Sequence, residues 1–172
     1  MIETERLKMC KFTSDDLEEL IKSRSDEDVI RYLGGISLQN PEAITKRLVF
    51  YIDCYEKYGF GMCKMIWKET GEMIGWSGIQ PLDGTQEIEV GYGMIKKFWK
   101  RGIGFEAAQG WLKFGFENCN LERIVAVASP ENVGSWRIME KCGMKREKVE
   151  TFYEMECLFY AVSKTEFQTM RF

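Results

Sequence analysis

The sequence predicts a mixed α/β (α+β) fold, in which helices flank a mostly antiparallel sheet of about seven strands. Three observations support this prediction. Helix-start signals and apolar residues at helical spacing fill the first third of the chain. Three short apolar segments separated by turn sequences follow, and a continuously apolar strand then stands between two later helices. Because 172 residues suffice to bury one core, we expect a single domain over residues 1–172.

The first third of the chain should form one strand and three helices. Leu7 and Met9 alternate with polar residues and predict a strand over 6–12. Thr13 and Asp16 are spaced as a capping box, which predicts a helix start. A short helix is expected over 26–32, ended by the glycines at 34–35, and a longer one from the Asn-Pro-Glu sequence at 40–42 to the glycine at 59.

The remainder should alternate strands and helices. We expect an antiparallel meander with strands over 61–68 and 73–80 and a third strand from residue 87. A helix over 105–118 and a buried strand over 123–129 come next. Asn132 should cap a helix that ends at Lys141, and strands over 145–152 and 155–163 complete the order βααα-βββ-αβαββ.

Composition excludes several classes of protein. The 45% of hydrophobic residues argues against disorder, and the net charge of −3 gives no general attraction to nucleic acid. Histidine is absent, which excludes His-based triads and His metal sites. The six cysteines include no CxxC pair, so we expect reduced thiols, no metal site and a cytoplasmic protein. Neither a signal peptide nor an apolar run of membrane-spanning length is present, so no membrane partner is expected.

A basic segment followed by two glycines predicts a site for a polyanion. Lys96, Lys97, Lys100 and Arg101 precede a helix start whose backbone N–H groups can bind phosphate. The sequence Gly-Ile-Gly-Phe-Glu-Ala at 102–107 also fits a dinucleotide-binding fingerprint, but the loop before it is too long and no repeated βαβ half is visible. Glycines that merely allow close helix packing are the alternative.

The sequence resembles the GNAT superfamily of acyl-CoA-dependent N-acetyltransferases, nearest the ribosomal-protein-alanine N-acetyltransferase branch. Four segments in the family's order carry the resemblance: Gly-Glu-Met-Ile-Gly at 71–75, Ile-Glu-Val-Gly-Tyr at 88–92, the loop from Phe98 to Ala107, and Pro-Glu-Asn-Val-Gly-Ser at 130–135 with Glu-Lys-Cys-Gly-Met at 140–144. The resemblance implies a centrally splayed sheet and the co-substrate acetyl-CoA, without a metal.

The resemblance also implies a set of cofactor-binding residues. The pyrophosphate would lie on the loop, and the pantetheine arm would lie in a gap of the sheet that Gly91 and Gly93 permit by a bulge or a splay. A backbone N–H of Val90 or Tyr92 would hold the thioester oxygen. The implied residues are Val90, Tyr92, Lys100, Arg101, Gly102, Ile103, Gly104, Phe105, Asn132 and Ser135. The chain departs from the broad superfamily at Trp99, where Gln or Arg is usual although Trp is common in this branch, and at Phe105, where Thr is frequent.

Two catalytic residues are implied, each beside a simpler interpretation. Glu89 occupies the position of the family's general base or amine-binding carboxylate, whereas Glu87 is more typical of a solvated face or an ion pair. Ser135 would lie near the CoA sulfur and donate to the leaving thiolate, or it is only a residue of the first helical turn. Met139 stands where many members carry a Tyr acid. Tyr153 and Tyr160 are weaker candidates for that acid and are interpreted first as core or strand residues.

The expected function is acetyl transfer from acetyl-CoA to a primary amine by direct attack. The sequence does not choose among a protein N-terminus, an amino acid, a polyamine and an aminoglycoside, although the acids at 26–28 could favour a cationic amine. A non-catalytic acyl-CoA-binding module on the same scaffold is the alternative, and a nicotinamide oxidoreductase would need βαβ halves that are not found. A monomer and a homodimer are both open.

Overall fold

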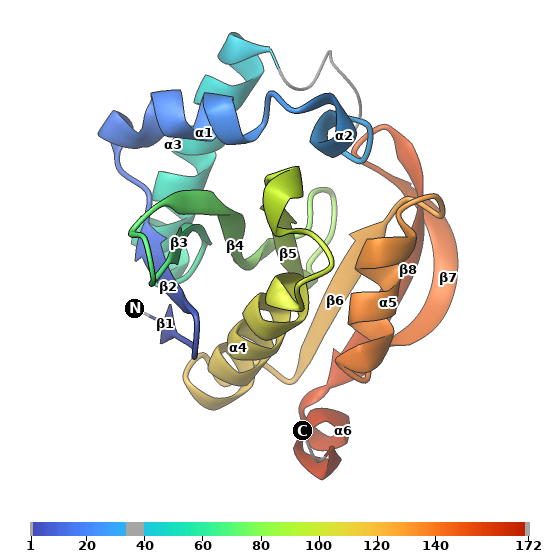
Figure 1. Ribbon diagram of the computed structural model, residues 1–172. Coiled ribbons are helices and arrows are strands. Elements are labelled where there is room, and N and C mark those ends of the chain that lie inside the picture. Colours follow the sequence, from blue (N-terminus) through green and yellow to red (C-terminus); the bar gives the residue numbers. More distant parts are fainter. Residues whose placement is uncertain (1, 34–39, 171–172) are drawn as a thin grey trace.

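An open sheet of eight strands runs through the molecule in the order β1-β2-β3-β4-β5-β6-β8-β7 (Figure 1). The computed structural model describes residues 2–33 and 40–170, so the predicted helix end at residues 34–35 lies outside the described residues. The strands are β1 (Ile2–Glu3), β2 (Leu7–Lys11), β3 (Met62–Trp67), β4 (Met73–Pro81), β5 (Ile88–Met94), β6 (Arg123–Ala128), β7 (Lys145–Phe152) and β8 (Met155–Ser163).

One pairing in the sheet differs from all the others. Neighbouring strands are antiparallel except β5 and β6, which are parallel and share a single register pair, Glu89 with Val125. The predicted meander is present, because β3, β4 and β5 pair in order. Since β5 and β6 contain seven and six residues, one shared pair means that the two strands diverge along most of their length.

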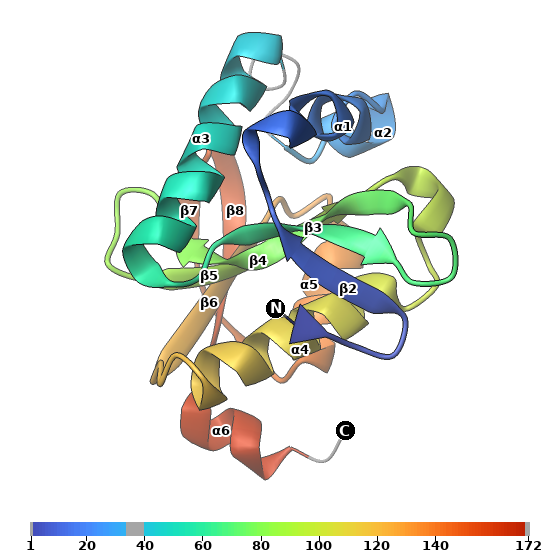
Figure 2. The ribbon, with the colours of Figure 1, turned by 90° about the vertical axis from the view of Figure 1, so that its left-hand side faces the viewer.

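Helices cover both faces of the sheet (Figure 2). On one face lie α1 (Leu17–Ser23), α2 (Glu27–Ile30) and α3 (Pro41–Tyr58), and on the other lie α4 (Ile103–Glu117), α5 (Val133–Lys141) and the C-terminal α6 (Lys164–Thr169). Each face has its own core. Leu20, Ile44 and Tyr51 belong to the first, whereas Trp111 and Leu112 belong to the second and larger one.

The helix ends follow from the cap residues. Thr13 and Asp16 form the predicted capping box before α1, with a short 3₁₀ turn at Ser14–Asp16. The side chain of Asn40 accepts a hydrogen bond from the N–H of Ala43 at the start of α3, and Gly59 ends that helix at φ +76°.

Asp16 should be a strong local determinant of stability. Its carboxylate caps the turn before α1 and forms an ion pair with Lys64 of β3, with 2.5 Å between Oδ1 and Nζ. Only 7% of the residue is exposed. We expect Asp16→Ala to lower the free energy of unfolding at pH 7 by about 2 kcal/mol, because it removes a cap and leaves a partly buried ammonium unpaired. Urea unfolding measures this loss. The exposed neighbour Asp15→Ala is the control, and equal stability of both variants would contradict the assignment.

The structure adds two elements that were not predicted. A two-residue strand, β1, pairs with β2 at the sheet edge, which makes eight strands rather than about seven. Helix α6 follows β8, and its capping box of Ser163 and Glu166 is a sequence signal that was overlooked. Helix α4 also begins at Ile103 rather than Phe105. None of the helices in the described part of the chain combines the length and apolar composition needed to cross a bilayer.

Candidate functional site

A cavity of about 130 Å³ opens where β5 and β6 diverge. Its wall includes Gly91 and Tyr92 from β5, Val127 and Ala128 from β6, and the start of α5. The predicted loosening of the sheet at β5 is therefore a splay. It is not a bulge in β5, because β4 and β5 keep a continuous register from Gly75–Met94 to Pro81–Ile88.

The cavity reaches both faces of the sheet. Glu89 and Tyr51 line it on the side of α1–α3, and Ser135 and Met139 of α5 line it on the side of α4 and α5. Strand geometry explains this, since Glu89 and Val90 are neighbours in β5 and point to opposite faces. A gap in the sheet thus joins two surfaces that a fully paired sheet would separate.

Glu89 is buried in the cavity wall and held by neutral donors. Only 5% of the residue is exposed, and its Oε1 accepts hydrogen bonds from Gln80 Nε2 at 2.8 Å and from the Tyr153 hydroxyl. Among the described residues, no ion pair joins it to a cation within 4.0 Å. Burial raises the pKa of the Glu89 carboxyl, while the two hydrogen bonds and the charge of Arg47 lower it.

Tyr153 reaches Glu89 from a tight hairpin between β7 and β8. Tyr153 and Glu154 both have positive φ, +53° and +61°, which is the backbone of a two-residue type I′ turn. Positive φ is costly for residues other than glycine, so the position is strained where the side chain enters the cavity. The sequence showed the two-residue spacing. Tyr153 lies in the turn and packs against the core cluster that contains Phe152 and Phe159, so the interpretation as a strand residue is wrong and the one as a core residue is not.

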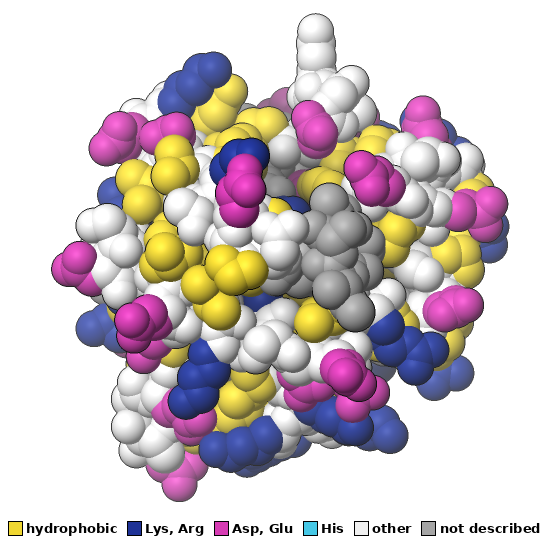
Figure 3. Space-filling model, turned by 90° about the horizontal axis from the view of Figure 1, so that it is seen from above, with side chains coloured by type: hydrophobic (Ala, Val, Ile, Leu, Met, Phe, Trp, Pro, Cys, Tyr) yellow, Lys and Arg dark blue, Asp and Glu magenta, His cyan; other side chains and the backbone are white. Residues whose placement is uncertain are grey.

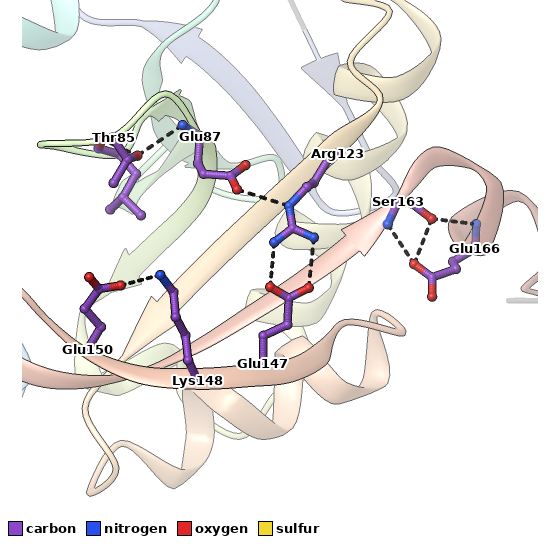
Figure 4. A network of polar contacts seen from close by, with 9 residues as sticks. Thr85, Glu87, Arg123, Glu147, Lys148, Glu150, Ser163 and Glu166 are labelled. Atoms are coloured by element: carbon purple, nitrogen blue, oxygen red, sulfur yellow. Dashed lines mark hydrogen bonds and ion pairs between the residues drawn. The ribbon is translucent and has the colours of Figure 1, made fainter.

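Glu87 has a separate, structural role. Its Oε1 accepts from Arg123 at 3.2 Å, and Arg123 also makes a two-point contact with Glu147 of β7 (Figure 4). This network ties the residue before β5 to β6 and β7, and an ion pair was one of the two simpler interpretations of Glu87. Glu87 and Glu89 therefore differ in environment although they are two residues apart.

The hydrogen-bonding pattern between β4 and β5 determines which N–H and C=O groups of β5 face β4 and which face β6. Leu82 donates to the carbonyl of Glu87 at 2.9 Å, and Ile95 donates to that of Ile74 at 3.0 Å. Because hydrogen-bonded pairs alternate in an antiparallel ladder, the odd-numbered residues of β5 face β4, and the N–H groups of Val90 and Tyr92 are directed toward β6.

Of these two N–H groups, that of Tyr92 is the better candidate for a ligand. The parallel register of Glu89 with Val125 directs the Val90 N–H toward the Val125 carbonyl. Tyr92 lies beyond that single pair, at the cavity wall. Farther along β5, the carbonyl of Met94 accepts from the Trp99 indole at 2.8 Å, which is a local reason for tryptophan at that unusual position.

Tyr92, Asn132 and Ser135 meet at the start of α5. The Tyr92 hydroxyl donates to the Ser135 carbonyl at 3.0 Å, and the Ser135 hydroxyl donates to Tyr92 Oη at 3.3 Å. Burial of the phenol raises the pKa of Tyr92, so it stays protonated at neutral pH. Asn132 Oδ1 accepts from the Ser135 N–H at 3.2 Å, which confirms its predicted role as helix cap. Met139 lies in the cavity wall one turn after Ser135.

The N-terminus of α4 offers backbone donors without a side-chain cap. Gly102 is the cap residue at φ +76°, a conformation that favours glycine, and its carbonyl accepts from the N–H of Glu106. The amides of Gly102, Ile103 and Gly104 are among those that a helix leaves without an intrahelical partner. The Glu106 carboxylate points away from them, because it accepts from Thr4 Oγ1 at 2.5 Å and Arg6 Nε at 2.6 Å. Arg6 also donates to the Arg101 carbonyl at 2.9 Å, which fastens the loop.

The basic segment before α4 is less free than the sequence suggested. Lys96 is paired with Asp28 and Lys97 with Glu72, and the Arg101 guanidinium lies 5.3 Å from the ring centroids of Trp67 and Phe98. The backbone amides are therefore better candidates than these cations for binding an anion.

Gly104 supports the packing interpretation of the second glycine. A Cβ there would lie 2.8 Å from Ile138 Cδ1 and 3.3 Å from Met94 Cε, so glycine lets α4 approach α5 and β5 closely. Glycine is thus favoured at the two positions for different reasons: a positive φ at Gly102 and close packing against α5 and β5 at Gly104.

Sequence reasoning missed the residues opposite Glu89. The same cavity is lined by side chains from β4 and from the first three helices: Arg24, Tyr32, Arg47, Tyr51, Trp76 and Gln80. Arg47 and Tyr51 are one turn apart on α3, and this i, i+4 spacing was a visible signal. Among the described residues, no group of three or more His, Cys, Asp or Glu is placed to hold a metal ion.

The residues from 6 to 145 match the model of the acetyltransferase (GNAT) domain family. The chain belongs to this family. The "Uncharacterized N-acetyltransferase YnaD" of Bacillus subtilis (strain 168) is 30% identical over 148 residues, which are 85% of this chain and 83% of that protein. The crystal structure of an acetyltransferase (GNAT family) from Bacillus anthracis has a TM-score of 0.79 at 28% identity, covering 96% of this chain and 99% of that one.

The shared fold extends to distant members. The aminoglycoside acetyltransferase AAC(6')-Ib, solved in complex with coenzyme A, has a TM-score of 0.79 at 15% identity and covers 96% of this chain and 99% of its own. The predicted GNAT family, the mixed α/β fold and the class of N-acetyltransferase are therefore confirmed. The finer resemblance to the ribosomal-protein branch stays a prediction.

Proposed function

We propose that this N-acetyltransferase transfers the acetyl group of acetyl-CoA directly to a primary amine while both substrates are bound, in the cytoplasm. One observation carries the proposal. The cavity at the β5–β6 gap joins a buried carboxylate, Glu89, on one face of the sheet to Tyr92 and Ser135 on the other. Two substrates that enter from opposite faces could therefore meet at the gap, without an acyl-enzyme.

The residues of the second face fit acetyl-CoA. The backbone amides from Gly102 to Phe105 would hold the pyrophosphate, helped by Lys100 and Arg101. The gap beside Tyr92 would admit the pantetheine arm, with Asn132 at its edge. The CoA-bound family member supports this assignment by its fold. Acetyl-CoA supplies a thioester carbonyl that a neutral amine can attack.

Glu89 would act as the base for the amine. An amine with a pKa near that of lysine, ~10, is protonated at neutral pH and must lose a proton before it attacks. Burial raises the pKa of the Glu89 carboxyl, which strengthens it as a base. The side-chain oxygen of Gln80 is buried without a hydrogen-bond partner, so it could accept the second amine proton and orient the nitrogen.

The other face would stabilise the charges that develop during transfer. The Tyr92 N–H would donate to the acetyl oxygen as negative charge grows there. When the new C–N bond has formed and the C–S bond breaks, the Ser135 hydroxyl would donate to the thiolate, with Tyr92 behind it. Because a thiol pKa near 8.5 makes the thiolate a good leaving group, this assistance should be modest.

A panel of amines tests the proposal. Purified protein with acetyl-CoA is offered protein N-terminal peptides, amino acids, polyamines and aminoglycosides, and free thiol is followed. We expect thiol release that depends on one class of amine, with an equal amount of acetylated product. Tight acetyl-CoA binding without release for any amine would instead identify a binding module.

Tyr153→Phe should move the pH dependence of the reaction. The Tyr153 hydroxyl lowers the pKa of Glu89, so its removal lets burial raise that pKa further. A base works only when deprotonated, so the acidic limb of the kcat profile should shift to higher pH, and activity lost at pH 7 should return at alkaline pH. Tyr160→Phe, whose hydroxyl contacts Glu140 instead, is the control. An unshifted limb would remove Tyr153 from the account.

A further inference from the structure

The wall of the cavity opposite the α4–α5 face is cationic and aromatic. Of the described residues that line it, Glu89 is the one acid, whereas Arg24 and Arg47 are both present. Tyr51 and Trp76 add aromatic side chains to the same lining. A substrate in this part of the cavity would therefore lie near two guanidinium groups as well as the carboxylate.

Arg24 is held in place as a buried cation. It is 2% exposed and its guanidinium lies 4.3 Å from the centroid of the Trp76 ring. Burial lowers its pKa to about 10, with Tyr51 raising it and the nearby Arg47 lowering it, so the group remains charged at neutral pH. The two arginines are close enough to repel one another, and an anion between them would relieve that repulsion.

Arg47 carries an unmet hydrogen-bonding group. Its Nε is buried without a partner, and within the described part of the chain no carboxylate forms an ion pair with it. A buried donor left unpaired is destabilising, and that cost is removed when a ligand supplies an acceptor. The planar guanidinium suits two-point binding of a carboxylate or phosphate.

The acids expected to attract a cationic amine lie elsewhere. Asp26 caps α2, and Asp28 pairs with Lys96, and neither lines the cavity. Figure 3 shows acidic and basic side chains interspersed over the face above α1–α3, so the outer surface favours neither sign. The charge preference of the acceptor side therefore comes from Arg24 and Arg47.

We infer that the acceptor is an amine that carries an anionic oxygen group, a carboxylate or a phosphate, which Arg47 and Arg24 bind while its nitrogen reaches Glu89. This inference rests on the proposed acetyl transfer. The arrangement also helps the chemistry, because positive charge near an amine favours its neutral form.

Matched acceptors and a charge-removing variant test the inference. Amino acids, their uncharged carboxamides, aminoalkylphosphonates and spermidine are compared by kcat/KM with acetyl-CoA saturating. We expect the acids or the phosphonates to exceed the carboxamides and spermidine by at least about tenfold, the free-energy scale of a hydrogen bond to a charged group. The preferred arm, carboxylate or phosphonate, identifies the anion.

Arg47→Gln should lower kcat/KM for the anionic acceptor about 10- to 100-fold more than for the carboxamide, mainly through KM. Lys57→Gln, which removes an exposed charge from the same helix, is the control. Equal loss for both acceptors would mean that Arg47 acts only on Glu89, and the inference would fall. A preference for spermidine or the carboxamides would overturn the inference while acetyl transfer stood. If none of the amines supported turnover, both the proposed function and the inference would be overturned.

Discussion

Glu89→Gln should lower kcat about 10²- to 10⁴-fold and leave the affinity for acetyl-CoA unchanged, because it removes the proposed base without altering the other face of the cavity. The variant should fold normally. Both hydrogen bonds from Gln80 and Tyr153 end on Oε1, and a glutamine keeps an oxygen that can accept them. The measurement is steady-state thiol release with a saturating acceptor, together with urea unfolding to verify stability.

The control for this substitution lies immediately before the same strand. Glu87→Gln removes an equal charge two residues away, where the carboxylate pairs with the exposed network around Arg123. We expect kcat to change less than twofold there. If Glu89→Gln retained full turnover at neutral pH, the assignment of a general base would be wrong, and the amine would have to enter already neutral.

Trp111→Ala should reduce the free energy of unfolding by about 3–5 kcal/mol, the cost of truncating a large aromatic side chain in a packed core. Trp111 is fully buried on α4 and packs edge-on against Phe114, with 5.6 Å between the ring centroids. Its indole N–H donates to Ser77 Oγ of β4 at 2.9 Å. The substitution therefore leaves a cavity and removes the donor to the buried Ser77 hydroxyl.

Two further variants separate the loss of packing from the loss of the indole hydrogen bond. Trp111→Phe keeps most of the apolar volume and loses only the indole donor, so its loss should be clearly smaller. Trp136→Ala on α5 truncates a partly exposed tryptophan that contacts the carbonyl of Pro130, and it should cost less than Trp111→Ala. Chemical denaturation of the three proteins gives the ranking. A Trp111→Ala loss below about 1 kcal/mol would show that α4 is not anchored through this residue.

The parts of the fold that could be predicted are those set by local patterns. Capping residues, turn sequences and alternation located most elements, and the strands at 145–152 and 155–163 were predicted with their observed bounds. Glu87 and Glu89 show the limit of such patterns. Alternation puts both on one face of β5, yet one pairs with Arg123 and the other is buried, because only tertiary packing brings Tyr153 and Gln80 over Glu89.

The acceptor side of the site could not be predicted for a similar reason. Arg24, Arg47 and Trp76 come from α1, α3 and β4, and no local spacing relates residues that far apart in sequence. The cofactor side was more accessible, because its loop is one continuous segment of the chain. Even there, the pairing of Lys96 with Asp28 depends on the placement of α2, which the sequence does not encode locally.

The central claim is that two substrates meet through the gap between β5 and β6, and a crystal structure with coenzyme A bound tests it most directly. The account predicts pyrophosphate oxygens about 3 Å from the N–H groups between Gly102 and Phe105. It also predicts a pantetheine arm between β5 and β6, and a sulfur atom on the Ser135 side of the cavity, facing Glu89. Coenzyme A bound along another edge of the sheet, with the gap filled by side chains, would contradict the account.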